Sequence, residues 1–198
     1  MAISVESGAN SLLELLWVRE AWGLHPRGDN PPPLTNPPIF LGRAEQAPVW
    51  EEAWPGIWEE CLRFTAHGAD PRELRRLHTT ADGSPERAEI LSELAGPNWR
   101  ERFGVAAFDE SFSAWQQTFY DELGKSNAVP VDATPERLAL DALVPAWEAG
   151  LTKVVTIPCE GDYTRVLEKS AMLVTEETRQ EPGRYAAALS AFRRDVEV

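Results

Sequence analysis

The sequence contains only two cysteines, Cys61 and Cys159, and both lie in apolar surroundings. This is unlike the dense cysteine framework of a small secreted domain, so we expect two buried thiols. No stretch approaches the length of uninterrupted apolar sequence that a membrane-spanning helix needs. The N-terminal residues also carry no cationic patch, so we expect no signal peptide and a cytoplasmic location.

Positive charge is scarce as well, because 19 basic residues stand against 32 acidic ones and the formal net charge is -13. Such a chain repels phosphate backbones and anionic membrane surfaces, so neither a nucleic acid nor a membrane is an expected partner. The charge would suit a basic protein partner, or mimicry of nucleic acid toward a protein that binds it. Many soluble proteins are acidic without either purpose.

Motifs for metal, phosphate and nucleophilic chemistry are missing. Cys61 and His67 are six positions apart and His78 lies beyond a helix break, so no pair has the spacing of a zinc site. There is no glycine-rich loop between a strand and a helix, and no serine flanked by glycines. We therefore expect no metal ion and no cofactor.

Helix signals, by contrast, occur along most of the chain. Three capping residues, Asp70, Ser84 and Thr134, each precede a proline that can occupy the first helical position. Ser11 is the expected N-cap of the first helix, with Glu14 closing a capping box. Hydrophobic periodicity and these signals predict helices at 12–23, 57–66, 71–78, 85–94, 108–123, 135–149 and 182–194.

A proline-rich stretch, residues 24–48, interrupts the helical pattern. Its seven prolines remove amide donors and fix the backbone, which predicts an extended segment. The apolar run Ile39, Phe40 and Leu41 indicates that this segment lies on the core.

Near the C-terminus the pattern changes to short runs of branched residues. These predict strands at 154–157 and 172–175, separated by a turn, and we expect the two to pair antiparallel. The predicted fold is therefore mainly α. It is a single helical domain over 1–198 with a Pro-rich crossing segment at 24–48 and a small two-stranded antiparallel sheet near the C-terminus.

Three tryptophans, Trp50, Trp54 and Trp58, recur every four residues directly after the Pro-rich segment. Residues four apart share one helix face, so they form an aromatic stripe that is buried in the core or reserved for a partner. We expect Pro55 to break the helix and to turn Trp50 and Trp54 out of register with Trp58. Trp50 and Trp54 are thus the candidates for exposure, and Trp58 is the candidate for the core.

The first functional hypothesis is a non-catalytic acidic protein-binding module of the inhibitor, immunity or adaptor type. A Trp- and Pro-rich surface would contact another protein, and a basic one suits the charge. Aromatic residues dominate interface hot spots, and a preformed proline-rich segment loses little entropy on docking. Trp50 and Trp54 are the predicted contact residues.

The alternative is a small cytoplasmic enzyme with its site at the C-terminal strand ends, around Cys159. This cysteine follows the first predicted strand, where mixed folds often present catalytic groups. Glu160 and Asp162 would raise the pKa of the thiol and suppress the thiolate, so a cation from elsewhere would be required. Tyr163 and Arg179 are the further candidate residues of this site.

Overall fold

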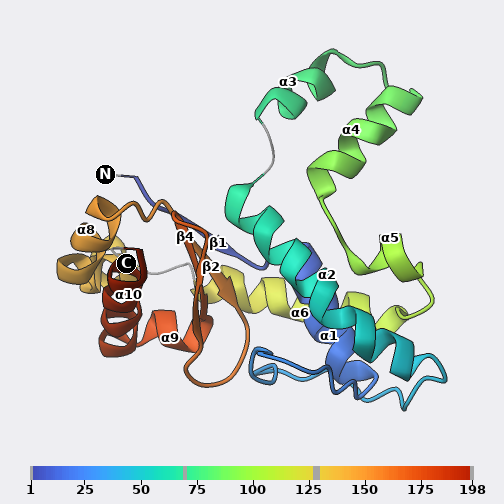
Figure 1. Ribbon diagram of the computed structural model, residues 1–198, viewed down its shortest axis with the longest axis horizontal. Helices are drawn as coiled ribbons and strands as arrows, with labels where there is room; N and C mark the ends of the chain where they lie inside the picture. Colours follow the sequence, from blue (N-terminus) through green and yellow to red (C-terminus); the bar gives the residue numbers. More distant parts are fainter. Residues whose placement is uncertain (1, 69–70, 127–129, 197–198) are drawn as a thin grey trace.

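The computed structural model describes residues 2–68, 71–126 and 130–196 (Figure 1). Helices make up most of these residues, which confirms a mainly α protein. None of the helices in these ranges is long and apolar enough to cross a membrane. In chain order the elements are β1 (Ser4–Ser7), α1 (Asn10–Ala21), α2 (Ala47–His67), α3 (Pro71–Thr79), α4 (Pro85–Ala95), α5 (Trp99–Phe103), α6 (Glu110–Ser126), the 3-10 turn η1 (Val131–Ala133), α7 (Pro135–Leu138), α8 (Leu140–Glu148), β2 (Lys153–Ile157), β3 (Thr164–Leu167), β4 (Ala171–Thr175), α9 (Glu176–Gln180) and α10 (Pro182–Val196).

The sheet has four strands in the order β1-β2-β4-β3. β1 pairs with β2 and β2 pairs with β4, both in parallel, whereas β3 pairs with β4 antiparallel. The expectation of a two-stranded antiparallel sheet is therefore wrong. Both predicted strands exist, as β2 and β4, but the segment between them is long enough to hold β3, and β3 takes the antiparallel position beside β4.

Side chains alternate along β2 and β4, so each face of the sheet packs against a different set of helices. The first hydrophobic cluster, which we call the aromatic core, joins one face to α1 and α2 and extends to α5 and α6. The second, the C-terminal core, joins the other face to α8 and α10. β2 and β4 contribute Val155, Ile157, Ala171 and Leu173 to the aromatic core and Val154, Met172 and Val174 to the C-terminal core. The buried tryptophans of the aromatic core are Trp17, Trp50, Trp54, Trp58, Trp99 and Trp115.

α1 is the central element of the aromatic core, and ten of its twelve residues are buried. It begins at Asn10, with Ala9 at the N-cap position, so Ser11 is not the cap that we expected. The chain turns directly from β1 into α1 through Gly8, whose φ of 76° favours glycine. Because this turn starts the helix early, Glu14 lies beyond the first turn and closes no capping box.

α2 runs without a break from Ala47 to His67, so the expected interruption at Pro55 is wrong. A proline inside a helix removes one hydrogen bond and costs about 3 kcal/mol. Here the large side chains on both sides of Pro55 are buried in one core, with Trp54 0% and Trp58 1% exposed. Burial of two indole rings offsets the lost bond, because each removes a large apolar area from water.

The other predicted caps have mixed outcomes. Ser84 caps α4, since its hydroxyl accepts the Arg87 N–H at 3.1 Å. The Thr134 hydroxyl makes no cap bond, and the predicted helix at 135–149 divides into α7 and α8. Asp70 lies outside the described residues.

The Pro-rich segment is held along α1 and the strand ends. The guanidinium of Arg19 donates to the carbonyls of Pro31 (2.6 Å) and Pro32 (2.7 Å). Leu34 is 1% exposed and forms an antiparallel bridge with Cys159. This part of the segment therefore covers the core, as expected.

α3 and α4 form a hairpin that stands apart from the rest of the molecule (Figure 1). We call residues 71–95 the α3–α4 arm. Ile90 is a buried hydrophobic residue of this arm, yet it belongs to neither hydrophobic core. Leu74 and Leu91 are each 47% exposed. The arm is thus stabilised mainly by contacts between its own two helices.

Candidate functional site

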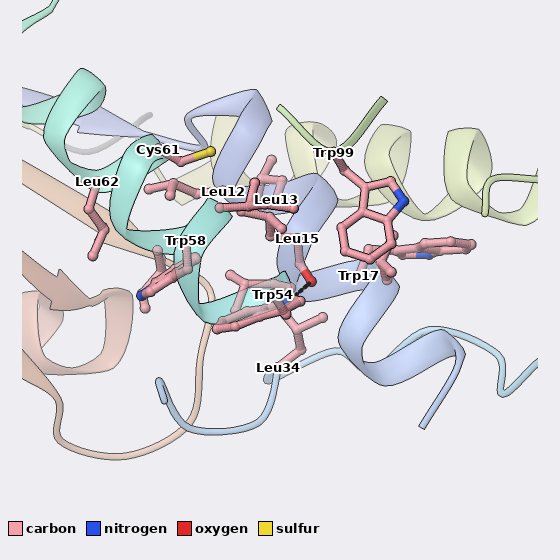
Figure 2. Packing of buried hydrophobic residues seen from close by; sticks show 14 of the residues in the cluster. Leu12, Leu13, Leu15, Trp17, Leu34, Trp54, Trp58, Cys61, Leu62 and Trp99 are labelled. Atoms are coloured by element: carbon pink, nitrogen blue, oxygen red, sulfur yellow. Dashed lines mark hydrogen bonds between the residues drawn. The ribbon is translucent and has the colours of Figure 1, made fainter. Parts of the chain in front are cut away.

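The two tryptophans predicted to face a partner are inside the aromatic core. Trp50 is 6% exposed and Trp54 is 0% exposed, so the expected exposure is wrong. The indole N–H of Trp54 donates to the carbonyl of Leu15 at 2.9 Å, a contact drawn in Figure 2. Since α2 is continuous through Pro55, all three tryptophans keep one face and turn it toward α1.

The aromatic rings around these tryptophans pack against one another. Trp54 and Trp58 are stacked with centroids 5.1 Å apart, and Trp58 is in the core as predicted. Trp50 makes edge contacts with Trp22 and Trp99, at 5.7 and 5.4 Å. Every ring of the stripe therefore has packing partners within the chain, and neither predicted contact residue presents a face to solvent.

Cys159 lies at the end of β2, as the enzyme hypothesis requires, but it is sealed. Its exposure is 0%, and the bridge to Leu34 closes the Pro-rich segment over it. Burial raises the pKa of the Cys159 thiol to about 12, an effect that the positive charge of Arg19 only partly opposes. The thiol is protonated and inaccessible at neutral pH, so it cannot act as a nucleophile.

The other residues of the predicted enzyme site do not gather in one cleft. Asp162 pairs with Arg184 at the surface, at 3.2 Å. Arg179 is held by carboxylates of α7 and α9, at 2.8 and 2.9 Å. The strand ends do border a cavity, but Cys159, Glu160, Asp162, Tyr163 and Arg179 are not among the residues that line it.

A pocket of about 630 Å³ opens at the start of α1, bordered by the ends of α2 and α4. Two carboxylates and two cations line it, and they neutralise one another. Arg100 Nε lies 2.6 Å from Glu14 Oε1, and Lys153 Nζ lies 2.7 Å from Glu6 Oε2. Lys153 also donates to the carbonyl of Thr65. The first ion pair joins α5 to α1. The contacts of Lys153 join β2 to β1 and to α2.

Glu14 is buried inside this pocket, at 3% exposure. Oε1 accepts from Arg100 and from Asn10 Nδ2, whereas Oε2 is buried without a donor among the described residues. The Arg100 guanidinium also lies over the Phe108 ring, 4.0 Å from its centroid. Glu14 and Arg100 are 86 positions apart, so sequence reasoning missed the pair; the one signal was a glutamate within an apolar run.

The tip of the Pro-rich segment is exposed, against expectation. Ile39 is 72% exposed and Phe40 is 65% exposed, although the apolar run had indicated core contact. Of the three residues in this apolar run, only Leu41 packs against the aromatic core. Next to Phe40, a groove of about 580 Å³ separates the Pro-rich segment from the end of α1, and several prolines line it.

The described residues contain no group of three His, Cys, Asp or Glu side chains that could hold a metal ion. Both cysteines are free and buried, as predicted. No model of a known protein family, no curated protein and no solved structure matches this chain.

Proposed function

We propose that the protein is a non-catalytic protein-binding module of the inhibitor, immunity or adaptor type, and that it contacts its partner through the tip of the Pro-rich segment. The observation that carries this proposal is the exposure of two consecutive large apolar side chains, Ile39 at 72% and Phe40 at 65%. Neighbouring apolar side chains on a surface favour a protein contact, and aromatic residues dominate interface hot spots.

The tip is also preorganised. Asn36 O accepts from the indole N–H of Trp115 at 2.7 Å, and the Leu41 amide donates to a carbonyl of α1 at the same distance. The Phe40 ring rests against Gly23, where an added Cβ would come within 2.9 Å of it. A surface that is held in this way loses little conformational entropy when it binds.

The net charge of -13 favours a basic partner. Complementary charge speeds the encounter of two proteins and is screened by salt. The association rate should therefore fall as ionic strength rises. The apolar contact at Ile39 and Phe40 would instead set the dissociation rate.

The test compares the wild type with the double variant Ile39→Ser/Phe40→Ser. A partner captured by the wild type is purified, and its dissociation constant is measured with both proteins by calorimetry. Loss of one hot-spot aromatic costs about 2 kcal/mol, so the double variant should bind at least about 30-fold more weakly. Its thermal stability should stay close to that of the wild type, since both side chains are exposed.

Val131→Ser is the matched control, because Val131 is 78% exposed and lies outside the Pro-rich segment. This variant should bind as tightly as the wild type. Equal affinity of the double variant and the wild type would refute the assigned surface. A large fall in the Tm of the double variant would instead assign the two side chains to the fold.

A further inference from the structure

A cavity lies at the carboxyl ends of the three parallel strands, and we call it the strand-end cavity. Unlike the pocket at the start of α1, it is lined by carboxylates without any basic side chain among its described residues. Ser7 ends β1, Thr156 and Pro158 lie at the end of β2, and Glu176 and Glu177 follow β4. The C-terminal half of α6 forms the opposite wall. The cavity has a volume of about 250 Å³.

The chain leaves these strands toward opposite faces of the sheet. After β1 it enters α1, which packs in the aromatic core, whereas after β4 it enters α9 and α10, and α10 packs in the C-terminal core. β2 lies between the two strands. In open sheets with parallel strands, a change of side of this kind leaves a crevice at the carboxyl ends, and small ligands bind there.

The walls of the cavity are mainly apolar on the side of α6 and β2. Phe119 and Leu123 come from α6, and Pro158 comes from the end of β2. At the end of β1, Thr156 Oγ1 lies 2.8 Å from Ser7 Oγ, so two hydroxyl groups meet in this part of the cavity. Mainly apolar walls with a few placed polar groups are typical of small-molecule sites.

The charges that line the cavity are all negative. Glu122, Glu176 and Glu177 contribute carboxylates, and none of the lining residues is a lysine, arginine or histidine. Glu177 uses Oε2 to accept the Gly161 N–H at 2.8 Å. Glu176 uses Oε1 to accept from Arg179, at 2.9 Å. Among the described residues, the second carboxylate oxygen of each of these two glutamates accepts no hydrogen bond, so it is available to a bound cation.

We propose that the strand-end cavity binds a small organic cation, in which a protonated primary amine is attached to a compact apolar body. The amine lies among the carboxylates of Glu122, Glu176 and Glu177, and the apolar body contacts Phe119 and Leu123. The volume is below the range of drug-sized pockets, so the ligand is smaller than a typical drug molecule. This inference is independent of the protein-binding proposal, which rests on the exposed side chains of Ile39 and Phe40.

The test uses three probes of the same shape and different charge: phenethylamine, 2-phenylethanol and phenylacetate. Each is titrated into the full chain, and binding is followed by two-dimensional amide NMR. Phenethylamine should bind about tenfold more tightly than the alcohol, because its hydrogen bonds to carboxylates are charge-assisted. Phenylacetate should give no saturable shifts. The shifted amides should include those of Ser7, Thr156 and Glu177.

The double variant Glu122→Gln/Glu177→Gln removes two negative charges and keeps an acceptor for the Gly161 N–H. It should reduce the preference for the amine over the alcohol from about tenfold to about one, and leave binding of the alcohol unchanged. Glu89→Gln/Glu93→Gln is the matched control, because it changes the net charge equally at exposed positions of α4. This control should keep the preference for the amine.

Leu123→Phe should narrow the cavity and weaken the binding of both the amine and the alcohol. The amide spectrum shows whether this variant is folded. If it is not folded, the glutamate variants test the proposal. Equal affinity for all three probes, absence of saturable phenethylamine binding, or shifts centred on the pocket near Glu14 would overturn the proposal. So would a preference for the amine that survives in Glu122→Gln/Glu177→Gln.

Discussion

α1 and the α3–α4 arm are both helical and both carry several leucines, but they are stabilised in different ways. In α1, ten of twelve residues are buried, and these include polar ones such as Glu14 and Arg19. In the arm, Ile90 is buried, whereas Leu74 and Leu91 remain 47% exposed. The arm also contributes no residue to either core.

The difference shows that helix formation and contribution to the core are separate properties. In the arm, the Ser84 cap and Pro85 at the first helical position specify where α4 begins, although α4 lies outside both cores. The free energy of unfolding depends instead on the apolar area removed from water, which is large for α1 and small for the arm. Substitutions in the two regions should therefore have unequal effects.

The largest effect is expected for Trp54→Ala in the aromatic core. Truncation of a buried tryptophan costs about 3–5 kcal/mol, and this indole is 0% exposed and bonded to Leu15 O. Urea unfolding followed by circular dichroism measures the loss. Trp147→Ala is the control, because Trp147 is 38% exposed and should lose about 1 kcal/mol or less. Equal losses in the two variants would contradict the assigned burial.

A pH dependence of intermediate size is expected from the two thiols of the aromatic core. Burial raises the pKa of Cys61 and of Cys159 from 9.0 to about 12. Above pH 9 the unfolded thiols lose their protons while the folded ones keep them, so stability is lost as pH rises from 9 toward 12. At pH 10 the loss is about 1.4 kcal/mol per thiol.

Urea unfolding at pH 8 and pH 10 measures this loss. The double variant Cys61→Ala/Cys159→Ala is less stable at both pH values because two side chains are truncated. The difference in stability between the two pH values should nevertheless be smaller by about 3 kcal/mol than in the wild type. A difference that is the same in both proteins would show that the thiols ionise normally in the folded state.

The smallest global effect is expected for Ile90→Ala. Ile90 belongs to neither hydrophobic core, so the substitution should open the arm locally and change global stability by about 0.5 kcal/mol or less. Amide hydrogen exchange should become faster in α3 and α4 and stay unchanged in α1. Leu91→Ala, at a 47% exposed position, serves as the control. Global destabilisation comparable with that of Trp54→Ala would show that the arm unfolds together with the core.

Local chemistry accounts for the parts of the fold that could be predicted. Ser84 caps its helix as the sequence indicates, and the branched residues of β2 and β4 form strands. The direction of pairing could not be predicted, because it depends on β1 and β3. β1 is a short, mostly polar run, and Thr156, the partner of Ser7, lies 149 positions along the chain.

The candidate sites were harder to predict than the fold. The spacing of Trp50 and Trp54 identified a helix face correctly, but spacing does not say which neighbour covers that face. The predicted helix break at Pro55 does not occur, because burial of Trp54 and Trp58 outweighs one lost hydrogen bond. The strand-end cavity joins residues from five segments, among them Ser7, Glu122 and Glu177, and no local pattern connects these positions.

The pairing of β1 with β2 also bears on how the chain folds during synthesis. β1 leaves the ribosome before its hydrogen-bonding partner Lys153–Ile157, which follows about 150 residues later. Until then the edge of β1 is unpaired, and the sheet face that α1 covers does not exist. Contacts between such distant segments slow folding, because a long loop must close before they can form. The aromatic core can therefore reach its final packing only after β2 has been made.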